Sequence, residues 1–142
     1  MPALTRRRYP ERPDCWHIYF GDVLVGSITR RTGQPHDQDA WEWRCGFYPW
    51  SDFGEDRNGT AASFEAARAA FEAAWLIFSA RRTEADYQAW RDHRDLTAWK
   101  YAMRDAGRQL PTCFPSGRSQ CFCGAPIEIA TMDRHVLAEH HG

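Results

Sequence analysis

The stretch over residues 64–82, "FEAARAAFEAAWLIFSARR", constrains the fold of this chain more than any other. Its apolar side chains recur at the spacing of one helical stripe: Phe64, Ala67, Phe71, Trp75 and Phe78. Alanines with Leu76 and Ile77 fill much of the remaining surface, so only a narrow polar band is left. A helix this apolar must be largely buried. We therefore expect a long helix, capped by Thr60 or Ser63, that packs against a sheet.

Three strand-like runs precede this helix and would supply the sheet. "WHIYF" and "VLVGSIT" flank a Gly21-Asp22 pair, which predicts a β-hairpin with strands near 16–20 and 23–30. The run "WEWRCGFY" over 41–48 alternates apolar and polar residues, as a half-buried third strand does. "PWSDFGEDRNG", over 49–59, predicts a long turn-rich loop.

A second long helix is predicted over "EADYQAWRDHRDLTAWKYAMRDA", ending at Gly107. One of its sides gathers Ala85, Ala89, Leu96, Trp99 and Met103. Its other side gathers Tyr87, Trp90, Arg94 and Tyr101. Either the N-terminal or C-terminal segment covers this second stripe, or the stripe binds a partner, because Trp, Tyr and Arg are enriched at binding hot spots.

Together these elements predict an α+β protein: a three-stranded antiparallel sheet packed by two long helices, plus a small C-terminal subdomain. We divide the 142 residues into a flexible basic arm (1–13), a βββαα core domain (14–108) and a C-terminal subdomain (109–142). No apolar run reaches the roughly 20 residues that span a bilayer, and "MPALTRRRYPERP" lacks the apolar region of a secretory signal. We expect a cytoplasmic protein with no membrane partner.

The last 22 residues, "CFCGAPIEIATMDRHVLAEHHG", hold two cysteines and three histidines. Zinc takes four nitrogen or sulfur ligands in a tetrahedron, and such sites commonly pair cysteines on a turn with histidines on one side of a helix. Cys121 and Cys123 lie on a tight turn, and His135 is followed by His140 at a suitable spacing, whereas His141 fits less well. The alternative is that the cysteines are small core residues and the histidines a solvated helix end. Elsewhere, Cys15, Cys45 and His17 are expected in the core.

This segment resembles a C2H2 zinc finger, and "MDRHVLAEHH" is similar to the histidine-bearing helix of the single finger in bacterial Ros-type transcriptional regulators. The resemblance implies a structural Zn²⁺ held by Cys121, Cys123, His135 and His140. Only Phe122 separates the two cysteines, where the usual finger has at least two residues, and strain at this turn would bring in Cys113 instead.

The rest of the chain, especially "CWHIYFGDVLVGSI", "WEWRCGFYP" and "NGTAASFEAARAAFEAAW", resembles small uncharacterised proteins of rhizobial-type bacteria. In that family the tail also carries a Cys-x-Cys-Gly turn followed by histidines. The resemblance therefore supports a metal site and implies no activity.

An enzymatic role is not expected. "HVLAEHH" does not match the H-E-x-x-H pattern of zinc hydrolases, and the chain has no phosphate-cradling glycine loop and no nucleophile elbow. Four protein ligands around zinc make a structural site, because a catalytic zinc keeps one position open.

Two binding functions remain as hypotheses. We favour a protein partner or self-association through Tyr87, Trp90, Arg94 and Tyr101. The alternative is a nucleic-acid-binding regulator that uses a basic helix face and the arginines Arg6, Arg7, Arg8 and Arg12. A net charge of −1 disfavours the alternative, because phosphate neutralisation needs a basic surface.

Overall fold

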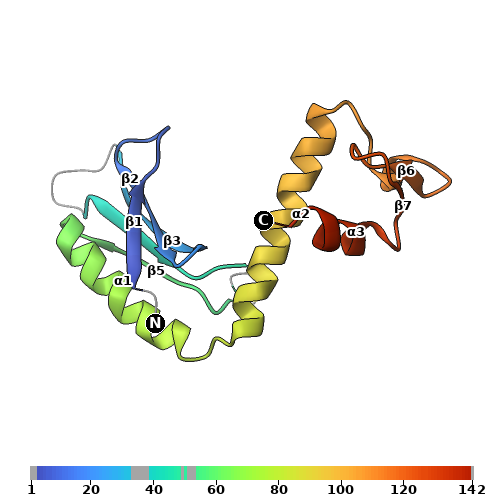
Figure 1. Ribbon diagram of the computed structural model, residues 1–142. Coiled ribbons are helices and arrows are strands. Elements are labelled where there is room, and N and C mark those ends of the chain that lie inside the picture. Colours follow the sequence, from blue (N-terminus) through green and yellow to red (C-terminus); the bar gives the residue numbers. More distant parts are fainter. Residues whose placement is uncertain (1–2, 33–38, 49, 51–53, 142) are drawn as a thin grey trace. The chain divides into compact units, whose positions relative to one another are not determined.

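The computed structural model describes residues 3–32, 39–48, 50 and 54–141. The elements follow one another along the chain as shown in Figure 1: β1 (Leu4–Arg8), β2 (Cys15–Phe20), β3 (Val23–Arg30), β4 (Trp41–Cys45), β5 (Arg57–Ala61), α1 (Phe64–Ser79), α2 (Glu84–Asp105), a 3₁₀ turn (Pro111–Cys113), β6 (Arg118–Gln120), β7 (Pro126–Glu128) and α3 (Met132–Glu139). By contacts the chain forms two compact units, residues 1–90 and 91–142, which share α2.

The N-terminal unit contains a five-stranded antiparallel sheet in the order β1-β2-β3-β4-β5. The predicted three-stranded sheet is therefore wrong, although its strands correspond to β2, β3 and β4. The third of them ends at Cys45 instead of continuing to residue 48. The C-terminal unit adds a two-stranded sheet and α3, so the protein has two sheets and three helices among the described residues.

The sequence pattern did not indicate strand β1, because three consecutive arginines are not typical of a strand. Residues 4–8, assigned to a flexible arm, pair along their whole length with β2, from Leu4↔Phe20 to Arg8↔Trp16. The arginine side chains lie over aromatic rings: the Arg6 and Arg8 guanidinium carbons are each 4.9 Å from the centre of the Trp16 ring. Such cation–π contacts let a basic sequence form an edge strand.

The sequence pattern did not indicate strand β5 either, because "RNGTA" is typical of a turn. It pairs with β4, and Gly59 lies opposite Trp43. A Cβ at Gly59 would be only 2.9 Å from Cζ2 of Trp43, so the glycine makes room for this ring. Part of the predicted loop over 49–59 is thus a strand, while residues 49 and 51–53 lie outside the described residues.

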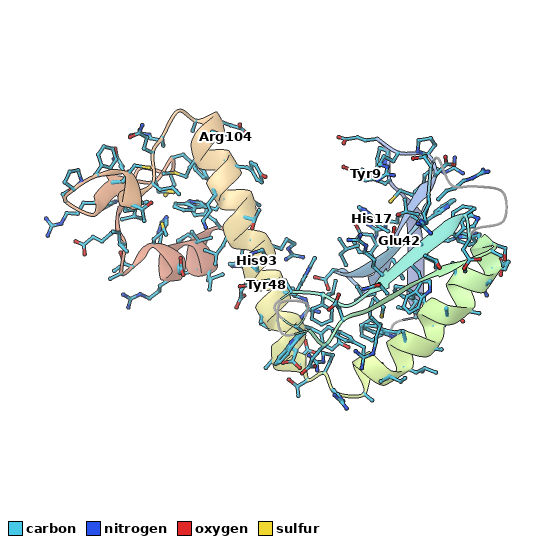
Figure 2. The ribbon with its side chains drawn as sticks, turned by 180° about the vertical axis from the view of Figure 1, so that it is seen from behind. Tyr9, His17, Glu42, Tyr48, His93 and Arg104 are labelled. Carbon is cyan, nitrogen blue, oxygen red and sulfur yellow. The ribbon has the colours of Figure 1, made fainter. Side chains whose placement is uncertain are left out.

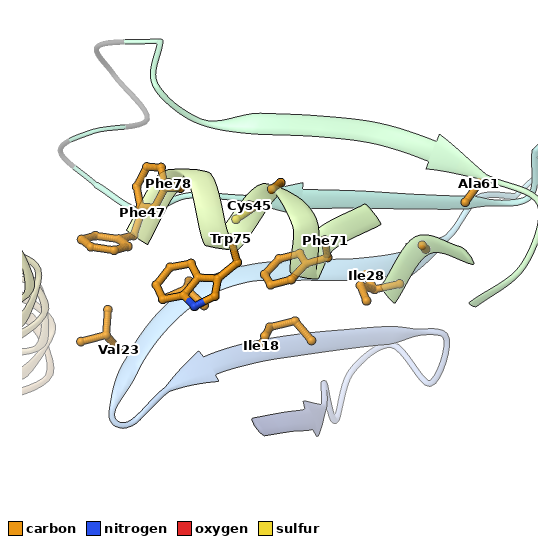
Figure 3. Packing of buried hydrophobic residues seen from close by; sticks show 12 residues of the cluster. Ile18, Val23, Ile28, Cys45, Phe47, Ala61, Phe71, Trp75 and Phe78 are labelled. Carbon is orange, nitrogen blue, oxygen red and sulfur yellow. The ribbon is translucent and has the colours of Figure 1, made fainter. Parts of the chain in front are cut away.

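Helix α1 forms where it was predicted and covers one face of the sheet, but the expectation that it is largely buried is wrong, because Leu76 and Ile77 are exposed on its outer side. Its N-cap is Ser63, whose hydroxyl oxygen accepts a hydrogen bond from the Ala66 amide at 3.1 Å. The apolar stripe of the helix packs on Ile18 and Ile28 of the sheet, and Phe71, Trp75 and Phe78 are buried there (Figure 3). Burial of these side chains supplies the main stabilisation of this unit.

Helix α2 also forms as predicted, and it serves a different core at each end. Its first turns contribute Tyr87 and Trp90, which pack against the core of the N-terminal unit. Its later turns contribute Trp99 and Met103, which are buried in a second cluster within the C-terminal unit. The units consequently divide between residues 90 and 91, inside this helix, whereas the sequence predicted a boundary between residues 108 and 109.

No helix in the described part of the chain has both the length and the apolar character needed to cross a membrane.

Candidate metal centre

The two cysteines of the C-terminal segment lie on the tight turn that joins β6 to β7. The Cys121 amide donates a hydrogen bond to the Ala125 carbonyl, and the Gly124 amide donates one to the Cys121 carbonyl, both at 2.9 Å. Gly124 has a φ of +96°, which a residue with a Cβ rarely adopts. The glycine of the Cys-x-Cys-Gly sequence therefore closes a turn that brings both thiols to one place.

The two histidines come from α3 and its C-terminal end. His135 lies in the helix, and His140 is its C-cap, with its amide bonded to the Val136 carbonyl at 2.7 Å. Val136 and Ile127 of β7 are almost completely buried in the same cluster. Their packing holds the helix against the hairpin so that both imidazoles meet the cysteine turn.

The four predicted ligands converge on one point. All their ligand atoms lie within 4.8 Å of one another. The Nε2 atoms of His135 and His140 are 3.2 Å apart. The Cys121 Sγ to His140 Nε2 and Cys123 Sγ to His135 Nε2 distances are 3.4 and 3.5 Å. A tetrahedral zinc with ordinary bond lengths would separate two nitrogens by about 3.3 Å and a sulfur from a nitrogen by about 3.6 Å. The cluster can hold a metal ion.

Hydrogen bonding alone does not explain this arrangement. Each imidazole Nε2 carries either one hydrogen or one lone pair in the ring plane. The Nε2 of His135 nevertheless contacts both Cys123 Sγ and His140 Nε2, and that of His140 contacts both Cys121 Sγ and His135 Nε2. One in-plane position cannot serve two partners well, whereas a central ion accepts one lone pair from each of the four ligands.

The environment of Cys121 favours its thiolate form. Burial raises the pKa of this thiol, but hydrogen bonds from the Cys123 amide, the Trp99 indole, His135 and the Cys123 side chain outweigh burial and lower the pKa to about 6. The Trp99 Nε1–H donates to Cys121 Sγ at 3.2 Å within the buried cluster. Metal ions bind the thiolate, so surroundings that favour the thiolate suit a metal ligand.

Trp99 is the site residue that sequence reasoning missed. Its position at helical spacing from Leu96 and Met103 marked it only as a core residue. An indole N–H buried next to a predicted ligand is the signal that could have identified it, because a buried Trp usually finds an acceptor. Phe122, between the two cysteines, also contributes, since its ring lies 4.9 Å from that of His140.

The alternate ligands are not part of the cluster. Cys113 is exposed at the end of the 3₁₀ turn, and His141 is exposed beyond the helix. Cys45 is buried in the core of the N-terminal unit, as expected. Cys15 is also buried, but outside that core cluster, with its Sγ 3.3 Å from the Thr29 hydroxyl oxygen. His17 is half-buried instead, and its ring stacks on that of Tyr9 at 4.8 Å.

The four residues predicted to bind a partner have different surroundings in the structure and do not form one exposed surface. Tyr87 and Trp90 pack against the N-terminal core, and Arg94 donates to the Asp95 carboxylate at 3.0 Å. Tyr101 is 55% exposed. Its ring lies under the Arg104 guanidinium at 4.9 Å.

The four arginines predicted to bind nucleic acid also have different surroundings. Arg6 and Arg8 lie over Trp16, while Arg7 lies over Tyr19. Arg12 is exposed in the turn between β1 and β2.

Comparisons with protein-family models, curated proteins and solved structures found no match. The resemblances to Ros-type fingers and to small rhizobial-type proteins therefore stay at the level of sequence pattern. The support for a finger-like C-terminus comes from the geometry of the Cys/His cluster itself.

Proposed function

We propose that this chain is a non-enzymatic zinc-binding interaction protein, in which a structural zinc ion organises the C-terminal unit. The observation that carries this proposal is the convergence of Cys121, Cys123, His135 and His140 at the distances of a tetrahedral site. Two sulfur and two nitrogen ligands are a typical structural zinc set. Four protein ligands leave no coordination position for a substrate, which favours a structural role over catalysis.

The ligand set also explains how so small a unit can fold. Its buried cluster has only five members, Trp99, Met103, Cys121, Ile127 and Val136. Units with so little core usually need a metal or a disulfide, because apolar burial alone does not offset the chain entropy. Zinc binding would add free energy to folding here, since the ligands are brought together only in the folded unit.

The metal part of the proposal is tested by elemental analysis of freshly purified protein. One zinc per chain is expected for the wild type, and Cys123→Ser and His135→Ala should each lose it. Cys113→Ser and His141→Ala are matched controls, because they remove the same residue types from positions outside the cluster, and both should keep full occupancy. Loss of zinc in the controls, or its retention in both ligand variants, would contradict the proposed ligand set.

A protein partner or self-association is the binding role that we favour. Exposed large apolar side chains support it, because several belong to the unit that zinc would order: Tyr101, Phe114, Phe122 and Ile129. Of the four residues predicted to bind a partner, Tyr101 is the one that is mostly exposed. Aromatic side chains of this kind are common anchors in interfaces.

The partner role is tested with Tyr101→Ser and a matched control, Tyr48→Ser, which removes another exposed tyrosine. Tyr101→Ser should abolish binding of the partner captured by the wild-type chain, or reduce the oligomer mass measured by light scattering. Tyr48→Ser should change neither. Equal binding and equal mass for both variants would count against the role of Tyr101.

A further inference from the structure

The face of the five-stranded sheet opposite α1 carries polar side chains. Side chains alternate between faces along each strand. Because Ile18, Ile28 and Cys45 belong to the core beneath α1, their strand neighbours point to the opposite side. Strand register places one row there across all five strands: Arg7, His17, Ser27, Arg44 and Asn58. A second row contains Cys15, Thr29, Glu42 and Thr60. We call these two rows the polar sheet face.

Figure 2 shows Tyr9, His17 and Glu42 on the side of the sheet away from α1. Tyr9 extends the polar sheet face beyond β1, since its ring stacks on His17. Tyr19 lies on the same face of β2, and the Arg7 guanidinium is 4.7 Å from the centre of its ring. Aromatic rings and arginine planes are the groups on which unpaired bases stack.

One end of the polar sheet face is hollowed and rich in arginine. The hollow has a volume of about 450 Å³, and the charged residues that line it are four arginines and one glutamate: Arg12, Arg30, Arg31, Arg44 and Glu42. Arg44 is paired with Glu42 at 3.0 Å. By strand alternation Arg30 shares the α1 side of β3 with Ile28. Arg12 and Arg31 are therefore the two guanidiniums that the hollow can offer to a ligand.

Neither guanidinium forms an ion pair within the described part of the chain. Arg31 donates to the backbone carbonyl of Asp39 at 3.3 Å. The Asp39 carboxylate accepts from the Thr60 hydroxyl at 3.1 Å, and the nearby Glu11 carboxylate accepts from the Tyr9 hydroxyl at 3.0 Å, so these carboxylates bond to hydroxyls and not to the two guanidiniums. The hollow thus offers two unpaired guanidiniums to an anionic ligand.

We propose that the polar sheet face binds single-stranded nucleic acid. Arg12 and Arg31 hold phosphates in the hollow, and bases stack along the Tyr9–His17 pair. The complementary charge favours an anionic chain. The rows hold hydroxyl, amide and guanidinium groups, which contact phosphates and sugars, and they lack the large apolar anchors of a protein interface. This surface differs from the predicted one, because Arg6 and Arg8 belong to the opposite face of β1.

The test is fluorescence anisotropy with 15-nucleotide, mixed-sequence RNA and DNA strands and the full, zinc-loaded chain. Saturable binding is expected at 50 mM salt. If two phosphates are neutralised, raising the salt to 200 mM should weaken binding by about sevenfold. Affinity should come from the local surface, because the whole chain has a net charge of −1.

Two substitutions should weaken binding while the melting temperature stays unchanged. Arg31→Glu should cost about tenfold in affinity, and Tyr9→Leu should cost about tenfold by removing the stacking ring. Arg81→Glu is the matched control, because it reverses an exposed charge just beyond α1, and it should have little effect. If Arg31→Glu fails to fold, Arg12→Glu replaces it.

Three outcomes would overturn the proposal. The first is no binding of any strand at 100 µM protein. The second is equal loss in Arg31→Glu and Arg81→Glu. The third is equal affinity for a duplex of the same sequence or for a polyglutamate of equal length, because such ligands match the charge and lack unpaired bases.

Discussion

At the residue scale, the hydrogen bond between Trp99 and Cys121 links the helix that spans both units to the candidate metal centre. Trp99→Phe keeps most of the buried ring but removes the N–H that donates to the sulfur at 3.2 Å. Residues that bond to metal ligands typically change metal affinity by about 10- to 100-fold, so we expect a loss in that range. A competition titration with a zinc-binding dye measures it. Tyr101→Phe, on an exposed ring of the same helix, is the control, and an unchanged affinity in Trp99→Phe would contradict this role.

Gly26 of β3 is packed closely between the backbone of β4 and the Phe71 ring of α1. A Cβ here would lie 2.0 Å from the Arg44 carbonyl oxygen and 2.5 Å from Cε2 of Phe71. Gly26→Ala should therefore lower the free energy of unfolding by about 3 kcal/mol or more, because a backbone atom or a core ring must move.

Gly54→Ala is a useful comparison for that substitution. Among the described residues no atom lies within 4 Å of its Cβ position, and its φ of +74° disfavours a side chain. A loss of about 1 kcal/mol is expected. Urea denaturation measures both variants, and equal losses would show that close packing at Gly26 has been overestimated.

The Cys45 thiol should not react with alkylating reagents in the native protein. Burial, with a further contribution from Asp56, raises the pKa of its thiol to about 12. At pH 8 iodoacetamide should label the exposed Cys113 quickly and leave Cys45 unlabelled until the protein is unfolded. Peptide mass spectrometry after timed labelling checks this, and early labelling of Cys45 would contradict its burial.

The same pKa predicts alkaline destabilisation of the N-terminal unit. The native state keeps the Cys45 proton above pH 8.5, where the thiol of the unfolded chain loses it, so the unfolded state binds fewer protons. This contribution to stability is full below about pH 8.5 and decreases as pH rises toward 12. A Cys45→Ala variant should lose less stability between those pH values than the wild type in urea denaturation.

At the element scale, β1 is an edge strand that the N-terminal unit needs. Removing residues 2–8 should lower the free energy of unfolding by about 2 kcal/mol or more, since it removes five cross-strand pairs and exposes the edge of β2. Removing residues 2–3 leaves the strand intact and should cost little. Thermal unfolding compares the two truncations, and equal stability would favour the flexible arm expected from the sequence.

The elements that sequence reasoning found are those whose own periodicity identifies them. α1, α2 and the strands β2 to β4 each show an apolar pattern that fits a single structure. β1 and β5 do not, because "LTRRR" and "RNGTA" become strands only through their neighbours. The rings of Trp16 and Tyr19 accept the arginines of β1, and Trp43 fills the space above Gly59. Such tertiary contacts are invisible in a local pattern.

At the scale of the whole molecule, two separate cores predict two separate responses to metal removal. The cluster around Phe71 and Trp75 contains no ligand of the candidate metal centre, whereas Cys121 belongs to the cluster around Trp99. A strong chelator should therefore unfold the unit formed by residues 91–142 and leave the five-stranded sheet folded. Hydrogen exchange should become fast for β6, β7 and α3 and stay slow for β2 to β4. Uniform exchange across both units would contradict this separation.

The candidate site was more predictable than the fold of the whole chain. Spacing and the resemblance to a C2H2 finger pointed to the same four ligands, with Cys113 and His141 as alternates, because Cys121 and Cys123 share a turn and His135 and His140 share a helix end. The hydrogen bond from Trp99 to Cys121 could not be predicted, since Trp99 lies 22 residues before Cys121 in sequence. The division of α2 between two cores was equally hidden, because its two apolar stripes also fit a helix with one core and one partner surface.

The measurement that tests the central claim most directly is X-ray absorption at the zinc edge of the freshly purified chain. We predict one zinc per chain with two sulfur neighbours at about 2.3 Å and two nitrogen neighbours at about 2.0–2.1 Å. Cys123→Ser should remove one of the two sulfur neighbours or the metal itself. A metal-free wild-type chain, or a shell with three sulfurs or none, would contradict a structural zinc held by Cys121, Cys123, His135 and His140.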